Sequence, residues 1–281
     1  MSDSDQPQSV HVNGIDLAYL AQEGGDAVVF VHGSVNDYRS WRAQLTPFAE
    51  RYRTVSYSRH YHWPNDQPPA GSAYVAAQHA SDLGALIESL GLAPARVVGS
   101  SYGAMTALTC AVARPELICS LVLGEPPLLP WLARLPDGAA LLDSFLATAF
   151  RPAAEAFERG EAEVGVRSFI NGVIGAGAFD RLPPEARAMM LDNAAAMRAE
   201  TTTPPERYFP ALSTDDVGRL PMPVLLAEGE ASPHMFGLIT DELARALPAA
   251  ERLTIPAASH GMHAQNPAAY NAAVLAFLSK T

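Results

Sequence analysis

The 281-residue chain predicts an α/β fold in which a doubly wound, mostly parallel sheet carries an inserted all-helical cap. Short apolar runs of strand length alternate with helical stretches at both ends of the chain, a pattern typical of parallel strands joined by helical crossovers. Between Pro126 and Val217 there is no convincing strand, only helical stretches. We therefore expect a core made of residues 1–125 and 218–281, and a cap made of residues 126–217.

The N-terminal elements begin with a hairpin. Asn13-Gly14 favours a tight turn and lies within Val10 to Leu20, where apolar and polar residues alternate. Ala27 to Val31 is continuously apolar, as expected for a strand covered on both faces. The next expected elements are a helix from Trp41 to Tyr52, a strand from Arg53 to Tyr57, a helix from Tyr74 to Leu90 that stops at Gly91, a strand from Ala95 to Val98 and a helix from Ala104 to Ala113.

The remaining elements follow the same rhythm on either side of the cap. The expected core elements are strands at Leu117 to Leu123, Pro221 to Ala227 and Arg252 to Ile255, and a closing helix at Pro267 to Leu278. In the cap, helices are expected at Ala139 to Phe150, Ala162 to Val173 and Pro184 to Ala199, separated by turn signals such as Pro152 and Gly175. A helical insertion of this size between two strands of the sheet is typical of a cap or lid over a site.

Composition excludes several classes of function. The formal net charge of −11 disfavours nucleic acid and anionic membrane surfaces as partners, because both attract basic patches. No apolar run is long enough to span a bilayer. Lys280 is the only lysine, which excludes lysine Schiff-base and Walker chemistry.

The cysteines and the N-terminus suggest a cytoplasmic protein. We expect Cys110 and Cys119 to be small buried hydrophobic residues and not a disulfide or a metal site. The segment from Met1 to Ser9 is polar and acidic, unlike a signal peptide. A reducing cytoplasm is the simplest location, and the sequence leaves the oligomeric state open, a homodimer included.

The most informative motif is Gly99-Ser100-Ser101-Tyr102-Gly103, which lies between an expected strand and an expected helix. It has the form G-x-S-x-G. A serine on such a sharp turn exposes its hydroxyl, while the flanking glycines let neighbouring backbones pass without clashing. The start of the following helix directs free N–H groups towards an oxyanion formed there.

Further motifs in the same order make the chain resemble the α/β-hydrolase fold family from Val10 to Leu278. These are His32-Gly33 after a strand, the serine motif, and Ser259-His260-Gly261-Met262-His263 followed by Asn266-Pro267. The resemblance implies a catalytic triad in the order nucleophile, acid, histidine, and no cofactor.

The resemblance assigns roles to individual residues. It makes Ser101 the nucleophile and His260 the general base, with His263 as the alternative base. The oxyanion hole would consist of the backbone N–H groups of Tyr102 and Ser34, or of Val35 if the second donor lies one residue further on.

The acid departs from the usual family pattern. Most relatives have an aspartate where this chain has Ser232, and a serine cannot stabilise an imidazolium by charge. Glu125 instead follows Gly124 at the end of the strand after the serine helix, where some family members, including certain fungal lactonases, place a triad glutamate. We predict Glu125 as the acid, with Glu230 and Glu228 as the alternatives.

Some residues near the expected site have less certain roles. Substrate contacts are assigned to His32, Val35, Trp131 and His60, although His32 also suits support of its own loop. His60 belongs to an aromatic and histidine-rich run that ends at Trp63, where the family usually has an Asp-x-Arg-Gly loop. No metal site is expected, because no CxxC or HExxH motif is near the run.

The sequence therefore predicts a serine hydrolase that cleaves a small apolar ester or lactone through an acyl-enzyme. A carbon–carbon bond hydrolase acting on a diketone is the nearest alternative, since similar triads serve both reactions. A lyase, a cofactor-independent oxygenase and a non-catalytic ligand receptor share the same scaffold, and the fold alone does not separate them.

Overall fold

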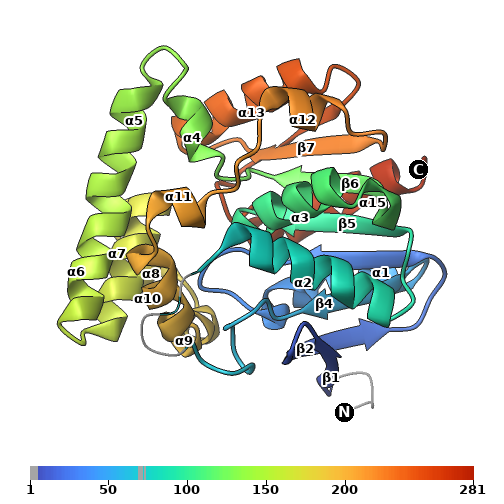
Figure 1. Cartoon of the computed structure of the whole chain (residues 1–281), viewed down its shortest axis with the longest axis horizontal. Helices are drawn as coiled ribbons and strands as arrows, with labels where there is room; N and C mark the ends of the chain where they lie inside the picture. The colour runs from blue at the N-terminus through green and yellow to red at the C-terminus, as the bar shows by residue number, and fades with distance from the viewer. Residues whose placement is uncertain (1–5, 69–71, 73) are drawn as a thin grey trace.

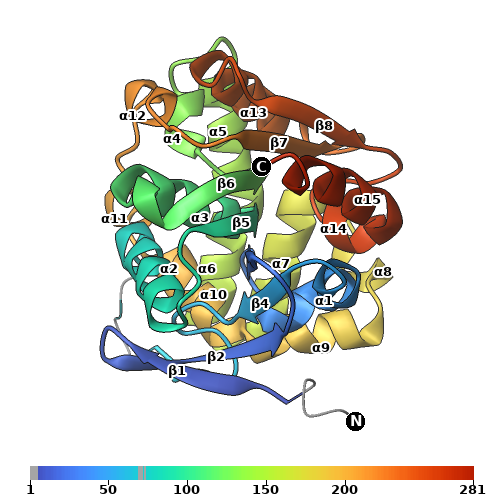
Figure 2. The ribbon, with the colours of Figure 1, turned by 90° about the vertical axis from the view of Figure 1, so that its right-hand side faces the viewer.

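The computed structural model describes residues 6–68, 72 and 74–281, so the first five residues of the polar segment from Met1 to Ser9 lie outside it. Within this part of the chain, a single sheet has the strand order β1-β2-β4-β3-β5-β6-β7-β8 (Figures 1 and 2). The strands are β1 (Gln8–Val12), β2 (Ile15–Gln22), β3 (Ala27–Val31), β4 (Arg53–Tyr57), β5 (Ala95–Ser100), β6 (Ile118–Gly124), β7 (Val224–Gly229) and β8 (Glu251–Ile255).

The sheet is parallel except at its N-terminal edge. β1 and β2 form the expected antiparallel hairpin, and β2 is antiparallel to β4. Asn13 and Gly14, which join β1 to β2, both have positive φ angles, at 49° and 83°, as a tight hairpin turn of this type requires. From β4 to β8 every neighbouring pair is parallel, which confirms the predicted fold class.

Helices cover both faces of the sheet, and β3 therefore has buried side chains on both sides. Val29 and Val31 belong to the cluster that packs under α2 and α3, whereas Val28 and Phe30 belong to the cluster under α1 and α15. The helices of the core are α1 (Arg42–Ala49), α2 (Ala76–Ser89), α3 (Tyr102–Ala113), α13 (His234–Ala246), α14 (Met262–Gln265) and α15 (Pro267–Leu278), with short 3₁₀ turns at Tyr38–Trp41 and Pro115–Leu117.

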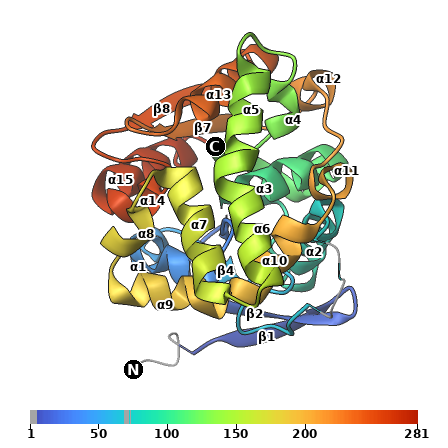
Figure 3. The same ribbon diagram turned by 90° about the vertical axis from the view of Figure 1, so that its left-hand side faces the viewer.

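Between β6 and β7 the described chain is helical, as the sequence predicts. Figure 3 shows α5, α6 and α7 standing in front of the sheet, and Figure 1 shows the same group on one side of the molecule. The inserted helices are α4 (Leu129–Leu132), α5 (Gly138–Phe145), α6 (Arg151–Glu158), α7 (Ala162–Ile174), α8 (Ala178–Arg181), α9 (Pro184–Asp192), α10 (Ala194–Thr202), α11 (Pro205–Tyr208) and α12 (Thr214–Gly218).

Two details of the expected helices are wrong. The chain does not turn at Pro152, because a π-helical segment at Leu146–Phe150 joins α5 to α6 without a break. The proline lies in the first turn of α6, where its missing N–H leaves no helical hydrogen bond unmade. α13 was not expected, although Met235, Phe236, Ile239 and Leu243 recur at helical spacing and are buried.

The expected helix from Pro184 to Ala199 also breaks, at Asn193, where the cap contacts the core. The Asn193 side chain donates to Asp37 Oδ2 at 2.7 Å and to Met189 O at 2.8 Å, and it accepts from the Trp63 N–H at 2.9 Å. The bonds to Asp37 and Trp63 hold the junction of α9 and α10 against the loops after β3 and β4.

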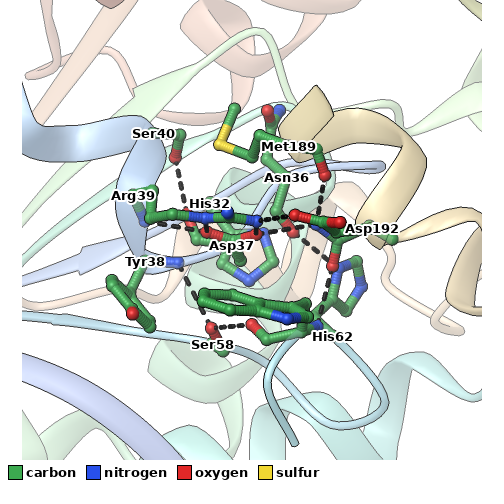
Figure 4. Close-up of polar contacts among 12 residues, drawn as sticks. His32, Asn36, Asp37, Tyr38, Arg39, Ser40, Ser58, His62, Met189 and Asp192 are labelled. Atoms are coloured by element: carbon green, nitrogen blue, oxygen red, sulfur yellow. Dashed lines mark hydrogen bonds and ion pairs between the residues drawn. The ribbon is translucent and has the colours of Figure 1, made fainter. Parts of the chain in front are cut away.

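An arginine reinforces the same contact between cap and core. Arg39 pairs with the buried carboxylate of Asp37 through two nitrogens, at 2.9 and 2.7 Å, and one of them also reaches Asp192 Oδ2 at 2.8 Å. Figure 4 shows Arg39 between the two aspartates, close to Asn36 and Met189. Across the described residues, no helix is both long enough and apolar enough to cross a membrane.

Candidate active site

The turn that carries Ser101 has the strained geometry expected of an exposed nucleophile. Ser101 lies between β5 and α3 with φ 53° and ψ −125°, a conformation that non-glycine residues rarely adopt. Its N–H donates to Gly124 O at 2.7 Å, which fixes the turn against β6. A Cβ at Gly99 would lie 2.6 Å from Ala104 Cα, and one at Gly103 would lie 2.1 Å from Val31 O. Both flanking glycines are therefore required by packing.

Three side chains from distant segments form a continuous hydrogen-bonded chain. His260 Nε2 lies 2.8 Å from Ser101 Oγ, and His260 Nδ1 lies 2.6 Å from Glu125 Oε2. A carboxylate only accepts hydrogen bonds, so it holds the imidazole proton on Nδ1 and leaves Nε2 free to accept from the serine hydroxyl. Phe236 stacks on the imidazole with ring centres 4.0 Å apart and fixes its plane.

The backbone at the end of β6 holds Glu125 rigidly. Glu125 has a φ of 48° and is 1% exposed, and its second oxygen accepts from the Gly229 N–H at 2.9 Å. The alternative acids point elsewhere. Glu228 accepts from Arg252 at 3.2 Å, and Glu230 accepts from the Ala257 N–H at 2.8 Å. Of the three carboxylates, the one that meets the imidazole is therefore Glu125.

His263 is buried three residues beyond His260 and does not reach the serine hydroxyl. Its ring stacks on Trp41 with centres 4.3 Å apart. Burial, with a smaller contribution from His260, lowers the pKa of His263 to about 4, so the ring is neutral at pH 7. A neutral packed ring suits support of the histidine loop.

Two backbone N–H groups beside the serine are free to bind an oxyanion. Tyr102 is the first residue of α3, and a Cβ at Gly33 would lie 3.1 Å from Ser101 Cβ, so the loop before Ser34 passes directly beside Ser101. Among the described residues, neither the Ser34 nor the Tyr102 N–H donates to another protein group. Val35 is buried with a φ of 52° and is not among the residues that line the cavity.

A cavity roofed by the cap opens onto Ser101 and His260. Besides these two residues, its polar lining comes from Ser34, Asn36, Ser40, Ser100, Tyr208, His263 and Gln265. Among the described lining residues there is no lysine, arginine, aspartate or glutamate. The other lining side chains are apolar and come mostly from the cap, among them Leu129, Phe145, Phe150, Phe169, Ile170, Val173, Leu182, Met189 and Met190. The cavity therefore suits an uncharged, largely apolar ligand.

The four residues assigned to substrate contact are not among those that line this cavity, which corrects the sequence interpretation. His32 and Val35 are buried beneath the loop, and Trp131 donates its Nε1–H to Leu212 O at 2.9 Å inside the cap. His60 bonds Asp82 at 2.9 Å and faces a separate depression with Arg207. In the described part of the chain, no group of three histidine, cysteine, aspartate or glutamate residues is arranged to hold a metal ion.

Two buried charged residues next to the site were missed. Glu200 of α10 accepts from Ser34 Oγ at 2.6 Å and from Tyr208 Oη at 2.5 Å, and burial raises its pKa. Arg59 lies behind the loop of His32 and Gly33 and is 1% exposed. Glu200 belongs to no recognisable local motif. Arg59 occupies the arginine position of the place where the family usually has an Asp-x-Arg-Gly loop, and that motif could have drawn attention to it.

Known proteins agree with this architecture. A family model described as alpha/beta hydrolase family matches residues 28–273. The putative non-heme bromoperoxidase BpoC of Mycobacterium tuberculosis is 29% identical, covering 94% of this chain and 98% of that protein. Epoxide hydrolase 2 of Siraitia grosvenorii is 32% identical over 41% of this chain, and the match spans only 36% of that protein. A solved structure of Est816, described as an N-acyl homoserine lactone degrading enzyme, superposes with a TM-score of 0.75 at 21% identity, covering 96% of this chain and all of that one.

Proposed function

The chain belongs to the alpha/beta hydrolase family, and on that basis we propose that it cleaves an apolar ester or lactone through an acyl-enzyme on Ser101. The observation that carries the proposal is the chain of hydrogen bonds from Ser101 through His260 to Glu125, at 2.8 and 2.6 Å. A hydroxyl is a weak nucleophile at neutral pH, so it needs a base in hydrogen-bond contact and a group that orients the base.

The acylation step follows from this geometry. His260 Nε2 accepts the hydroxyl proton while Ser101 Oγ forms a bond to the carbonyl carbon of the substrate. The negative oxygen of the tetrahedral intermediate accepts hydrogen bonds from the N–H groups of Ser34 and Tyr102. As the intermediate collapses, the imidazolium gives its proton to the departing alkoxide. The bond to the alcohol breaks, and Glu125 stabilises the imidazolium throughout.

Deacylation repeats the same proton transfers with water. His260 takes a proton from a water molecule that attacks the acyl carbon, the second intermediate collapses, and the proton returns to Ser101 Oγ. The products are a carboxylic acid and the restored serine, or one hydroxy acid when the substrate is a lactone. The largely apolar lining of the cavity favours an uncharged acyl group.

A fluorophosphonate probe with mass spectrometry tests the proposal directly. We expect labelling on the peptide that contains Ser101, none in Ser101→Ala, and turnover of at least one member of a panel of p-nitrophenyl esters and lactones. A folded protein that neither reacts with the probe nor turns over the panel would contradict the proposal and favour a lyase or a ligand receptor. Turnover of diketones alone would favour carbon–carbon bond hydrolysis.

A further inference from the structure

Arg59 is a buried cation that the proposed reaction does not yet use. Its guanidinium follows β4 and is 1% exposed, and among the described residues no carboxylate lies within ion-pair distance of it. A buried charge without an ion-pair contact is costly, and the carboxylate of Glu200 favours this one only from a greater distance, so its position needs a reason. The aromatic rings of Tyr102 and Tyr74, centred 4.6 and 5.6 Å from the guanidinium carbon, supply part of its stabilisation.

The guanidinium directs its N–H groups at the loop beside the nucleophile. Nε donates to His32 O at 3.0 Å, Nη2 donates to Gly33 O at 3.1 Å, and Nη1 donates to Tyr74 Oη at 2.5 Å. Two of its three contacts are therefore backbone carbonyls of the two residues that precede Ser34.

His32 donates to the same Gly33 carbonyl. The backbone N–H of Arg59 donates to His32 Nε2 at 2.9 Å, so Nε2 acts as the acceptor and the ring proton must sit on Nδ1. Nδ1 lies 2.8 Å from Gly33 O and donates to it. Burial, followed by the charge of Arg59, lowers the pKa of His32 well below its ordinary value, which keeps the ring in this neutral form.

The Gly33 carbonyl and the Ser34 N–H belong to one peptide group. In a trans peptide they point in opposite directions and share the same delocalised electrons. Hydrogen bonds from a cation and an imidazole to the oxygen withdraw electron density from the nitrogen, and hydrogen bonds linked in this way strengthen one another. We propose that Arg59, together with His32, positions and polarises the Gly33–Ser34 peptide so that the Ser34 N–H binds the oxyanion more strongly.

This inference rests on the proposed function and assigns Arg59 the role of a positioning residue, since it acts on the reacting atoms through a peptide group. A purely structural role predicts something different. If Arg59 only held the loop in place, its loss would lower stability and weaken ground-state binding as much as it slowed the chemistry. Polarisation acts where charge develops, so its loss must lower kcat more than it raises KM.

The experiment compares Arg59→Gln with Arg59→Lys. Arg59→Gln removes the charge, whereas Arg59→Lys keeps the charge but loses the planar guanidinium that donates to two carbonyls at once. Leu83→Ala provides the matched control, because Leu83 is fully buried between α2 and the sheet and takes no part in the site. For each variant we would measure the melting temperature, kcat and KM for a p-nitrophenyl ester, and the affinity of a trifluoromethyl ketone whose adduct carries an oxyanion.

Removing an oxyanion donor outright costs roughly 10²- to 10³-fold in kcat, so weakening one should cost about 10- to 100-fold. We expect Arg59→Gln to lose about 10- to 100-fold in kcat, while its KM changes less than about threefold. Its affinity for the trifluoromethyl ketone should fall in parallel, and Arg59→Lys should show an intermediate effect. If Arg59→Gln does not fold, Arg59→Lys and His32→Ala test the same carbonyl and should lower kcat in the same way.

Three results would overturn the inference. The first is an unchanged kcat in the folded Arg59 variants. The second is a drop in kcat matched by a rise in KM and a lower melting temperature, with the ketone affinity intact. The third is a wild-type protein whose Ser101 does not react with a fluorophosphonate, which would refute the proposed function itself. The first two results leave labelling and turnover of the wild type in place, so the two failures are distinguishable.

Discussion

Glu125→Gln gives the sharpest test of the site, because the structure determines how the amide would sit. The Gly229 N–H donates to Glu125 Oε1 at 2.9 Å, so it would retain the amide oxygen there and turn the amide nitrogen towards His260 Nδ1. An NH₂ group cannot accept the Nδ1 proton. The imidazole would therefore shift its proton to Nε2, where it can no longer accept from Ser101 Oγ at 2.8 Å.

The expected loss follows from the charge that the substitution removes. At an effective dielectric constant near 20, a carboxylate about 4 Å from the centre of an imidazolium stabilises it by about 4 kcal/mol, or about a thousandfold in rate. The wrong tautomer adds to this, and the corresponding substitution in a serine protease triad costs about 10⁴-fold in kcat. We therefore expect Glu125→Gln to lower kcat by about 10³- to 10⁴-fold.

The assay is steady-state hydrolysis of a p-nitrophenyl ester, with thermal unfolding recorded alongside it. Glu230→Gln and Glu228→Gln are the matched controls, because each removes one charge from a carboxylate that points away from the imidazole. Both controls should remain within about threefold of the wild type. The reasoning fails if folded Glu125→Gln retains more than a tenth of the activity, or if Glu230→Gln is the more damaging change.

Three further predictions concern stability. Burial raises the pKa of Glu200, so its contribution to the stability of the fold is present at low pH and is lost as the pH rises through the raised pKa. As the pH rises above about 4.5, the melting temperature of Glu200→Gln should therefore increase relative to that of the wild type. The pKa of His263 is lowered to about 4, so wild-type stability should fall as pH drops from 6.5 towards 4, by up to about 3 kcal/mol, and denaturant titrations should show this loss reduced in His263→Phe. Asn193→Leu removes the hydrogen bonds to Asp37 and to the Trp63 N–H, so the same titrations should show a free energy of unfolding lower by about 2 to 4 kcal/mol, and KM should rise. A variant as stable as the wild type would contradict the role of this contact.

The sequence could predict the sheet and the serine turn because both depend on local patterns. The run from Ala27 to Val31 is apolar throughout, and a strand with this pattern has to be covered on both faces wherever it lies in the sheet. The conformation at Ser101 is set by Gly99 and Gly103, which are only two residues away. The proximity of Glu125 to His260 follows from strand order, since β6 lies between β5 and β7 and the ends of parallel strands share one edge.

Side-chain direction was less accessible to sequence reasoning. Trp131 and His60 have residue types that suit a ligand site, yet each satisfies its polar atoms away from the cavity, with Leu212 O and Asp82 respectively. The break at Asn193 has the same origin, because its amide gains partners in the core loop that a continuous helix would not offer. Asp37 and Trp63 lie more than a hundred residues from Asn193 in the sequence, so helical periodicity carries no sign of them.

If the proposed reaction takes place here, the distribution of charge around the cavity explains how an apolar site would favour an oxyanion. The described lining has no charged side chain, yet Arg59 and Glu200 lie directly behind it and reach the loop of Ser34 through hydrogen bonds. A positive charge placed behind the peptide favours a negative oxygen in front of it without binding the free carboxylate product directly. Burial raises the pKa of Glu200, which accepts a hydrogen bond from Ser34 Oγ on the same loop. In the proposed reaction the loop would therefore respond to the charge that develops, while its surface stays suited to an uncharged substrate.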